Sequence, residues 1–371
     1  MNTVVCEIDK CCGCNACVNI CPKKCISIVD NIKSLNAIIN KDICINCKIC
    51  EKVCQVNNIT SKLIKFNKVE KCYEGLTRIN DINELASSGG FATTLGYEFA
   101  KNGGFVVGIK SDKETFYFDL TNNPEKIKLF AGSKYVKVST KNIYIKIKEK
   151  LINNEMVLFF GVPCQVAGLK LFLQKEYSKL YTVDLICHGT PSEKVLLKYL
   201  KEKQIDNTMN ISFRKKHQYQ LFKDNQPILT RTICDPYTIG FLNGLFYTEN
   251  CYSCRYATSE RISDITIGDS WGSSNRCNDG LKSLSLILLN SKKGEYLLSL
   301  LSDTFIFTER AYEDAIKYNN QLSHPSSKQP YTNFYFKHFE NMTTFKIIKK
   351  AYPKIILKQK IKYYLVKLHL K

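Results

Sequence analysis

Short apolar runs of strand length alternate with helical patterns through the middle of the chain. Met156 to Phe160 is continuously apolar, Leu180 to Ile186 is largely apolar, and helical patterns run near 141–153 and 192–203. A strand that is covered by helices on both faces has such a continuous run, because neither face meets water. The alternation therefore predicts an α/β core with a largely parallel or mixed sheet.

A further helix is expected after Gly90, where Phe91, Leu95 and Phe99 recur at helical spacing until Gly103 interrupts the pattern. Serines and glycines just before a helix leave backbone N–H groups open to a phosphate or a flavin edge, although an ordinary helix cap has the same composition. Further strands are expected at 105–110, 115–120 and 284–290.

The C-terminal segment is basic and has its own apolar periodicity. From 341 to 371 there are nine lysines and no acidic residue, and apolar residues that suit one helical face are interrupted at Pro353. A basic amphipathic helix can lie on an anionic membrane, dock on a partner or pack on its own domain. We therefore treat residues 331–371 as a basic amphipathic tail, for which peripheral membrane contact is one open role.

One cysteine spacing occurs twice near the N-terminus. It runs Cys11-x2-Cys14-x2-Cys17-x3-Cys21, and 33 residues later Cys44-x2-Cys47-x2-Cys50-x3-Cys54. This duplicated spacing is typical of two [4Fe-4S] clusters in which the fourth cysteine of each run binds the other cluster. We therefore expect an α+β ferredoxin-like dicluster module over residues 1–62. The expected ligand sets are Cys11, Cys14, Cys17 and Cys54 for one cluster, and Cys44, Cys47, Cys50 and Cys21 for the other.

Two other uses of these cysteines are weaker. Zinc would take two well-separated C-x2-C pairs, and a disulfide framework suits a small secreted domain. Nothing like a signal peptide occupies Met1 to Lys10, so the expected compartment is the reducing cytoplasm. Outside the pattern stand Cys6, Cys12 and Cys25, which are expected to be small buried hydrophobes.

Composition narrows the class of protein. The chain has 371 residues, 44% hydrophobic content and a formal charge of +20, which invites a nucleic-acid interpretation. Much of the excess charge lies in the tail, so nucleic-acid binding is a remote alternative, and a basic exterior also suits an acidic electron carrier. No apolar run approaches the ~18 residues of a membrane span.

Four later cysteines are scattered but suggestively placed. Cys164 and Cys187 each follow a predicted strand, at the edge where open α/β sheets bind ligands. Cys251 and Cys254 form a C-x2-C pair. From spacing alone, zinc, an iron–sulfur cluster and no metal at all are comparable interpretations.

These stretches together resemble the coenzyme F420 hydrogenase/dehydrogenase beta-subunit family. The resemblance rests on Gly161-Val162-Pro163-Cys164-Gln165, Ile186-Cys187-His188-Gly189, Cys251-x2-Cys254 and Asp264-Ile265-Thr266-Ile267-Gly268-Asp269-Ser270-Trp271-Gly272, and extends to Ser87-Ser88-Gly89-Gly90 and Gly132-Ser133-Lys134-Tyr135. It covers most of residues 72 to 330.

The resemblance implies FAD beside a third [4Fe-4S] cluster. It makes Cys164, Cys187, Cys251 and Cys254 candidate ligands of that cluster, with His188 beside it. The candidate flavin contacts are Ser87, Ser88, Gly89, Gly90, Gly132, Ser133, Lys134 and Tyr135. Residues 72–155 would be the FAD-binding region and residues 156–330 the region of the third cluster.

The expected function is that of a flavin and iron–sulfur oxidoreductase. Electrons would pass between a ferredoxin-type carrier and a two-electron acceptor through the clusters and FAD. Coenzyme F420 is one acceptor that the resemblance suggests, and no short motif identifies it. The alternative is an electron-transfer subunit whose catalytic site lies on a partner chain.

Overall fold

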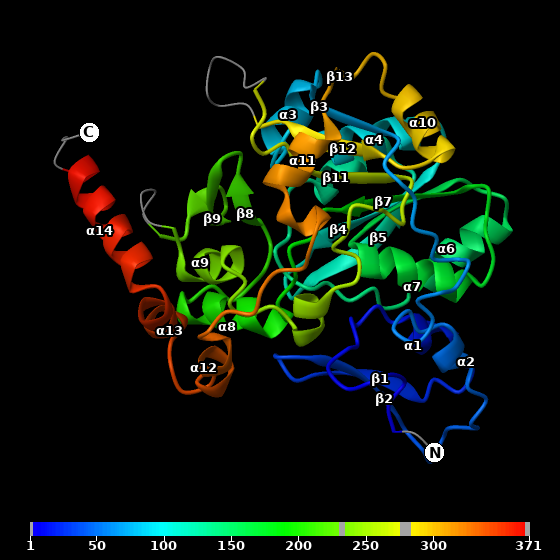
Figure 1. Cartoon of the computed structure of the whole chain (residues 1–371), viewed down its shortest axis with the longest axis horizontal. Coiled ribbons are helices and arrows are strands. Elements are labelled where there is room, and N and C mark those ends of the chain that lie inside the picture. The colour runs from blue at the N-terminus through cyan, green and yellow to red at the C-terminus, as the bar shows by residue number, and fades with distance from the viewer. Residues whose placement is uncertain (1–2, 230–233, 275–282, 368–371) are drawn as a thin grey trace.

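A computed structural model describes residues 3–229, 234–274 and 283–367. Its centre is a mixed eight-stranded sheet in the order β13-β3-β12-β11-β7-β6-β4-β5 (Figure 1). Neighbours are parallel from β11 through β7 and β6 to β4, and antiparallel elsewhere. The prediction of an α/β core with a mixed sheet is confirmed. The strands are β3 (Lys71–Thr77), β4 (Phe105–Ser111), β5 (Phe116–Thr121), β6 (Val157–Gly161), β7 (Leu180–Leu185), β11 (Ile265–Asp269), β12 (Ser285–Leu289) and β13 (Phe305–Glu309).

Helices cover both faces of this sheet, which explains the continuous apolar runs. In β6, Val157 and Phe159 face one hydrophobic core, whereas Leu158 between them faces the other. The first core includes α6 (Ile143–Ile152) and α7 (Pro163–Leu173), and the second includes α4 (Phe91–Lys101) and α10 (Lys292–Ser299). The predicted helices near 141–153 and after Gly90 are thus present, and each packs on one face of the sheet.

A second lobe lies beside the large sheet, and the sequence did not reveal it (Figure 1). Its three antiparallel strands are β8 (Ile211–Lys215), β9 (Gln218–Lys223) and β10 (Gln226–Pro227). The predicted helix near 192–203 is α8 (Glu193–Glu202), which begins at Ser192 because that hydroxyl accepts the Lys194 N–H. The remaining elements are α3 (Asn80–Leu85), α5 (Pro124–Ile127), η1 (Lys128–Phe130), α9 (Pro236–Leu242), η2 (Glu249–Ser253), α11 (Tyr312–Tyr318), η3 (Asn320–Leu322) and α12 (Thr332–Lys337).

The N-terminal region packs beneath α7 (Figure 1). It contains α1 (Ala16–Ile20), β1 (Ile26–Asp30), β2 (Leu35–Ile39) and α2 (Ile49–Lys52). Polar contacts fix it to the core: the Thr140 hydroxyl donates to the Cys14 carbonyl at 2.8 Å, and Arg255 donates to the Gln55 carbonyl at 3.1 Å. These contacts hold the two regions in one relative position.

The tail forms two helices, α13 (Thr344–Ala351) and α14 (Pro353–Lys367). Its apolar residues do not make one continuous face, because Ile356 is buried whereas Leu357, Ile361 and Tyr364 are exposed. Within the described part of the chain, no helix is both long and apolar enough to cross a membrane.

A buried ion pair lies inside the sheet. Asp184 of β7 is fully buried, Arg261 is 2% exposed, and an Arg261 Nη atom lies 3.3 Å from an Asp184 oxygen. Arg261 also donates to the Thr266 hydroxyl and to the Tyr256 carbonyl. Removing one partner would leave the other charge uncompensated and out of water.

We predict that Asp184→Ala lowers the free energy of unfolding by about 3–5 kcal/mol, because it strands the guanidinium of Arg261. Anaerobic denaturant titration measures the loss. The matched control is Asp303→Ala, at an exposed position, where the expected change is within about 0.5 kcal/mol. If both variants lose the same free energy of unfolding, the buried ion pair does not contribute more to stability than an exposed carboxylate does.

Candidate functional site

An outer cysteine group lies at the surface of the N-terminal region. It consists of Cys21, Cys44, Cys47 and Cys50, which line one pocket together with Cys25. Cys47 is exposed, and the other three predicted ligands are half-buried. These four residues are the set that the duplicated spacing assigns to one cluster.

An inner cysteine group lies deeper in the same region. It consists of Cys11, Cys14, Cys17 and Cys54, all of which are buried and line a second pocket. Burial, followed by the neighbouring thiols, raises the pKa of Cys17. A hydrogen bond from Cys6 is the main cause that lowers the pKa of Cys54 to about 7. A lowered pKa favours the thiolate, which is the form that binds metal.

The two cysteine runs repeat each other in their backbone geometry. Gly13 and Asn46, two residues after Cys11 and Cys44, have φ angles of 66° and 54°. Gly13 donates its N–H to the Cys11 sulfur, and Asn46 donates its N–H to the Cys44 sulfur, each at 3.4 Å. N–H donors to sulfur stabilise a thiolate and tune an iron–sulfur cluster.

The three cysteines outside the duplicated spacing line these same pockets. Cys6 and Cys12 lie at the inner pocket and Cys25 at the outer one, and all three are buried. Cys12 accepts a hydrogen bond from the Gln55 amide at 3.1 Å, and the Tyr256 hydroxyl donates to the oxygen of the same amide. Cys12 is therefore held by polar contacts that its burial alone does not suggest.

A core cysteine group forms at the carboxyl ends of β6 and β7. Cys164 is the second residue of α7, directly after β6, and Cys187 follows β7, to which β6 is a parallel neighbour. Cys251 and Cys254 come from η2 and the residue after it. Burial raises the pKa of Cys187, and the charges of the other three thiols raise it further. The four cysteines that resemble the family motif are thus gathered in one place.

A buried lysine faces this group. Burial alone would lower the pKa of Lys137, but the charges of Cys164, Cys251, Cys12 and Cys187 raise it overall. A cation in this position offsets negative charge on thiolates. Nothing in the sequence pattern distinguished Lys137 from the many surface lysines.

The inner and core cysteine groups are adjacent. The thiol of Cys12 interacts with those of both Cys14 and Cys164. On α7, a methyl group added to Gly168 would lie 2.8 Å from the Cys14 sulfur, so only glycine allows this close approach. No group of three or more His, Cys, Asp or Glu side chains among the described residues is arranged around a single metal ion. The corners of an iron–sulfur cube need wider spacing than the ligands of one ion.

The two predicted flavin-contact stretches lie against each other. The Ser133 N–H donates to the Ser87 hydroxyl at 2.8 Å, and the Ser88 hydroxyl lies 3.1 Å from that of Ser285. Gly89 is required by packing, because a methyl group there would lie 2.1 Å from the carbonyl oxygen of Gly75. Gly90 has a φ of 83° and precedes the first residue of α4.

The side chain of Lys134 is bound to the backbone of its own loop. Its ammonium group donates to the carbonyl oxygens of Phe130, Ala131 and Gly132 at 2.8, 2.6 and 3.0 Å. Burial lowers the pKa of Lys134 to about 7. Because its hydrogen bonds are directed at the backbone, Lys134 shapes this loop instead of presenting a free cation.

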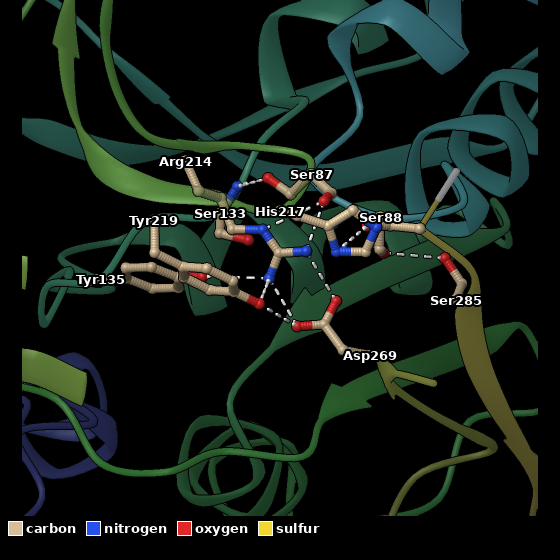
Figure 2. Close-up of polar contacts among 10 residues, drawn as sticks. Ser87, Ser88, Ser133, Tyr135, Arg214, His217, Tyr219, Asp269 and Ser285 are labelled. Carbon is tan, nitrogen blue, oxygen red and sulfur yellow. Dashed lines mark hydrogen bonds and ion pairs between the residues drawn. The ribbon is translucent and has the colours of Figure 1, made fainter. Parts of the chain in front are cut away.

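An arginine that the sequence did not indicate joins these stretches (Figure 2). The guanidinium of Arg214 contacts both carboxylate oxygens of Asp269, at 2.6 and 2.9 Å, and its Nε donates to the Ser87 carbonyl at 3.1 Å. Arg214 also donates to the hydroxyl of Tyr135, whose ring stacks on Phe241 with centroids 4.3 Å apart. Asp269 ends β11, so this network lies at the same carboxyl edge of the sheet as Cys187.

His188 directly follows Cys187, and the residue is exposed to solvent although much protein surrounds its imidazole. The surrounding protein lowers the pKa of His188 by desolvation, and the nearby carboxylate of Asp269 partly offsets that effect. The neutral imidazole is therefore favoured, and a neutral ring both donates and accepts a hydrogen bond.

We predict strong energetic coupling between Arg214 and Asp269, because the arginine side chain is only 3% exposed. In a double-mutant cycle of the two alanine variants, the expected coupling energy is about 1–3 kcal/mol in unfolding experiments. The exposed pair of Lys328 and Glu249, 2.7 Å apart, serves as the control cycle and should give less than about 1 kcal/mol. If the losses of unfolding free energy in the two single variants simply add in the double variant, the bidentate pair is contradicted.

Comparisons with known proteins indicate a protein family for part of the chain. Residues 154–314 match the family model that describes the C terminus of the coenzyme F420 hydrogenase/dehydrogenase beta subunit. Among solved structures, a chain from "Xenon derivatization of the F420-reducing [NiFe] hydrogenase complex from Methanosarcina barkeri" is 16% identical, and the match covers 79% of this chain and 93% of that chain with a TM-score of 0.49. A search of curated proteins found no match. Over residues 154–314, the match confirms the resemblance to the coenzyme F420 hydrogenase/dehydrogenase beta-subunit family.

Proposed function

We propose that this protein is an oxidoreductase that passes electrons along three [4Fe-4S] clusters toward FAD and a two-electron acceptor. The observation that carries the proposal is the order of the three cysteine groups. The outer group is at the surface, the inner group is buried, and Cys12 lies near both Cys14 of the inner group and Cys164 of the core group. A one-electron relay needs this succession of neighbouring sites.

The residues fit clusters by their chemistry. Each group offers four thiols, which is the number that a [4Fe-4S] cluster takes from its protein. Donors are already directed at individual sulfurs: Gly13 and Asn46 supply backbone N–H groups, and the Thr248 hydroxyl lies 3.4 Å from the Cys251 sulfur. When bound, each cluster supplies reversible one-electron transfer. Retaining thiols for iron also requires a reducing compartment, which we propose is the cytoplasm.

The support for FAD is of a different kind. It comes from the family match over residues 154–314 and from the junction of the two stretches at Ser87 and Ser133, next to Tyr135 and Arg214. Space beside Gly132 is open, with the Ser87 hydroxyl 4.0 Å from an added methyl group. We propose that Ser87, Ser88, Gly132, Ser133 and Tyr135 hold FAD, whereas Gly89, Gly90 and Lys134 shape the backbone around it. When bound, FAD supplies the exchange between single electrons and an electron pair.

The chain's own residues prepare this site. Arg214 and Asp269 hold the Ser87 stretch against the edge of the sheet, and Lys137 offsets negative charge at the core cysteine group. We propose that His188, next to Cys187 and within reach of the charge of Asp269, holds a proton near the flavin. Coenzyme F420, named in the family description, is one proposed acceptor, and a ferredoxin-type protein is the proposed carrier.

A second candidate role is that of an electron-transfer subunit in a larger redox complex. The observation that favours it is the family itself, which is a family of beta subunits. In that case the cofactors would be the same, and the substrate would react on a partner chain.

Anaerobic reconstitution tests the proposal. We expect about twelve irons and one FAD per chain, since three clusters of four irons are involved. Cys254→Ser should lower the count to about eight irons while the visible spectrum of the N-terminal clusters persists. Eight irons or fewer together with no flavin in the unsubstituted protein would contradict the proposal.

Turnover of the isolated chain then separates the two roles. The chain is mixed with a reduced viologen dye and with F420 or another two-electron acceptor. Acceptor reduction without any partner is the result expected for a complete oxidoreductase. Full cofactor content with no turnover until a partner chain is added would favour the subunit role instead.

A further inference from the structure

The surface above the outer cysteine group has an unusual composition. Cys47 is exposed, the other described cysteines being buried or half-buried. Ile43 and Ile45 beside it are 50% and 57% exposed, although isoleucine normally avoids water. Ile45 and Cys47 line the outer pocket itself. An apolar patch therefore lies directly over the site at which electrons would enter.

Exposed lysines surround this patch. Two of them line the outer pocket, and the others lie within three residues of a pocket-lining residue. In the part of the chain that the structure describes, none of the five takes part in an ion pair within 4.0 Å. Within residues 21–26 and 39–52, from which these lysines come, the only acidic residues are Asp42 and Glu51. We name this set the lysine ring: Lys23, Lys24, Lys41, Lys48 and Lys52.

We propose that the lysine ring and the patch of Ile43 and Ile45 form the docking surface for an acidic one-electron carrier protein. This inference rests on the proposed function, because it takes the outer cysteine group as the entry site for electrons. Unpaired lysines attract an acidic partner over a distance, and the small apolar centre excludes water where the two surfaces meet. A carrier seated here would hold its redox centre next to Cys47.

The transfer itself moves one electron and makes or breaks no bond. The carrier is oxidised by one electron, and the site held by Cys21, Cys44, Cys47 and Cys50 is reduced by one. The reverse transfer would use the same contact. The exposed lysines of α14 do not offer this arrangement, because they belong to the tail, which contains no cysteine.

The test uses charge reversal away from the pocket lining. In the ring variant, Lys24, Lys41 and Lys52 are each changed to Glu; in the matched control, the exposed tail residues Lys354, Lys358 and Lys362 are each changed to Glu. Both variants change the net charge equally. Stopped-flow absorbance follows mixing with a reduced acidic 2[4Fe-4S] ferredoxin at low ionic strength, and a zwitterionic viologen dye is the small reductant.

We expect the ring variant to lose at least about tenfold in the second-order rate constant with ferredoxin, which lies within the range of electrostatic steering. The control variant should change less than about twofold. Near 1 M salt, where the Debye length falls to about 3 Å, the difference should largely disappear. Iron content and reduction by the dye should be the same in all three proteins.

Three results would overturn the docking surface: equal losses in both variants, no loss in either, or dye reduction of the unsubstituted protein without any reduction by ferredoxin. Absence of the outer cluster from the unsubstituted protein would instead overturn the proposed function. If the ring variant loses iron, the salt dependence of the unsubstituted protein decides the matter, since a rate independent of salt contradicts docking through charge.

Discussion

The close contact between the N-terminal region and α7 is the constraint on which the rest of the account depends. Gly168 lets the Cys14 sulfur approach the helix, and Cys12 then lies between the inner cysteine group and Cys164. A larger residue at position 168 would force Cys14 or α7 to shift. Because tunnelling of electrons weakens steeply with distance, a small gap here decides whether the three cysteine groups work as one relay.

The strands of the core and the helices flanking them could be predicted, because burial on both faces of a sheet leaves a continuous apolar run. The positions of Cys164 and Cys187 followed from the same logic, since parallel neighbours bring their carboxyl ends to one edge. Arg214 and Lys137 could not be found this way. Each is a single basic residue whose burial depends on partners far away in the sequence, such as Asp269 and Cys251.

The structure also divides the glycine-rich and lysine-bearing stretches into two kinds of residue. Gly89 is explained by the close carbonyl of Gly75, and Lys134 by three carbonyls of its own loop. Ser87 and Tyr135 instead meet Arg214 at the edge of the sheet. A motif therefore identifies a region reliably, whereas the role of each member depends on contacts that spacing does not encode.

The central claim is that electrons pass from the outer cysteine group through the inner group to the core group. Rapid-freeze EPR of Cys17→Ser, mixed with a reduced one-electron carrier, tests this order most directly. In the variant we expect the outer site to be reduced while the core site stays oxidised over the time in which the unsubstituted protein reduces both. Slow reduction with dithionite should still reveal the core signal. A core site that is reduced as fast in the variant as in the unsubstituted protein would contradict the relay.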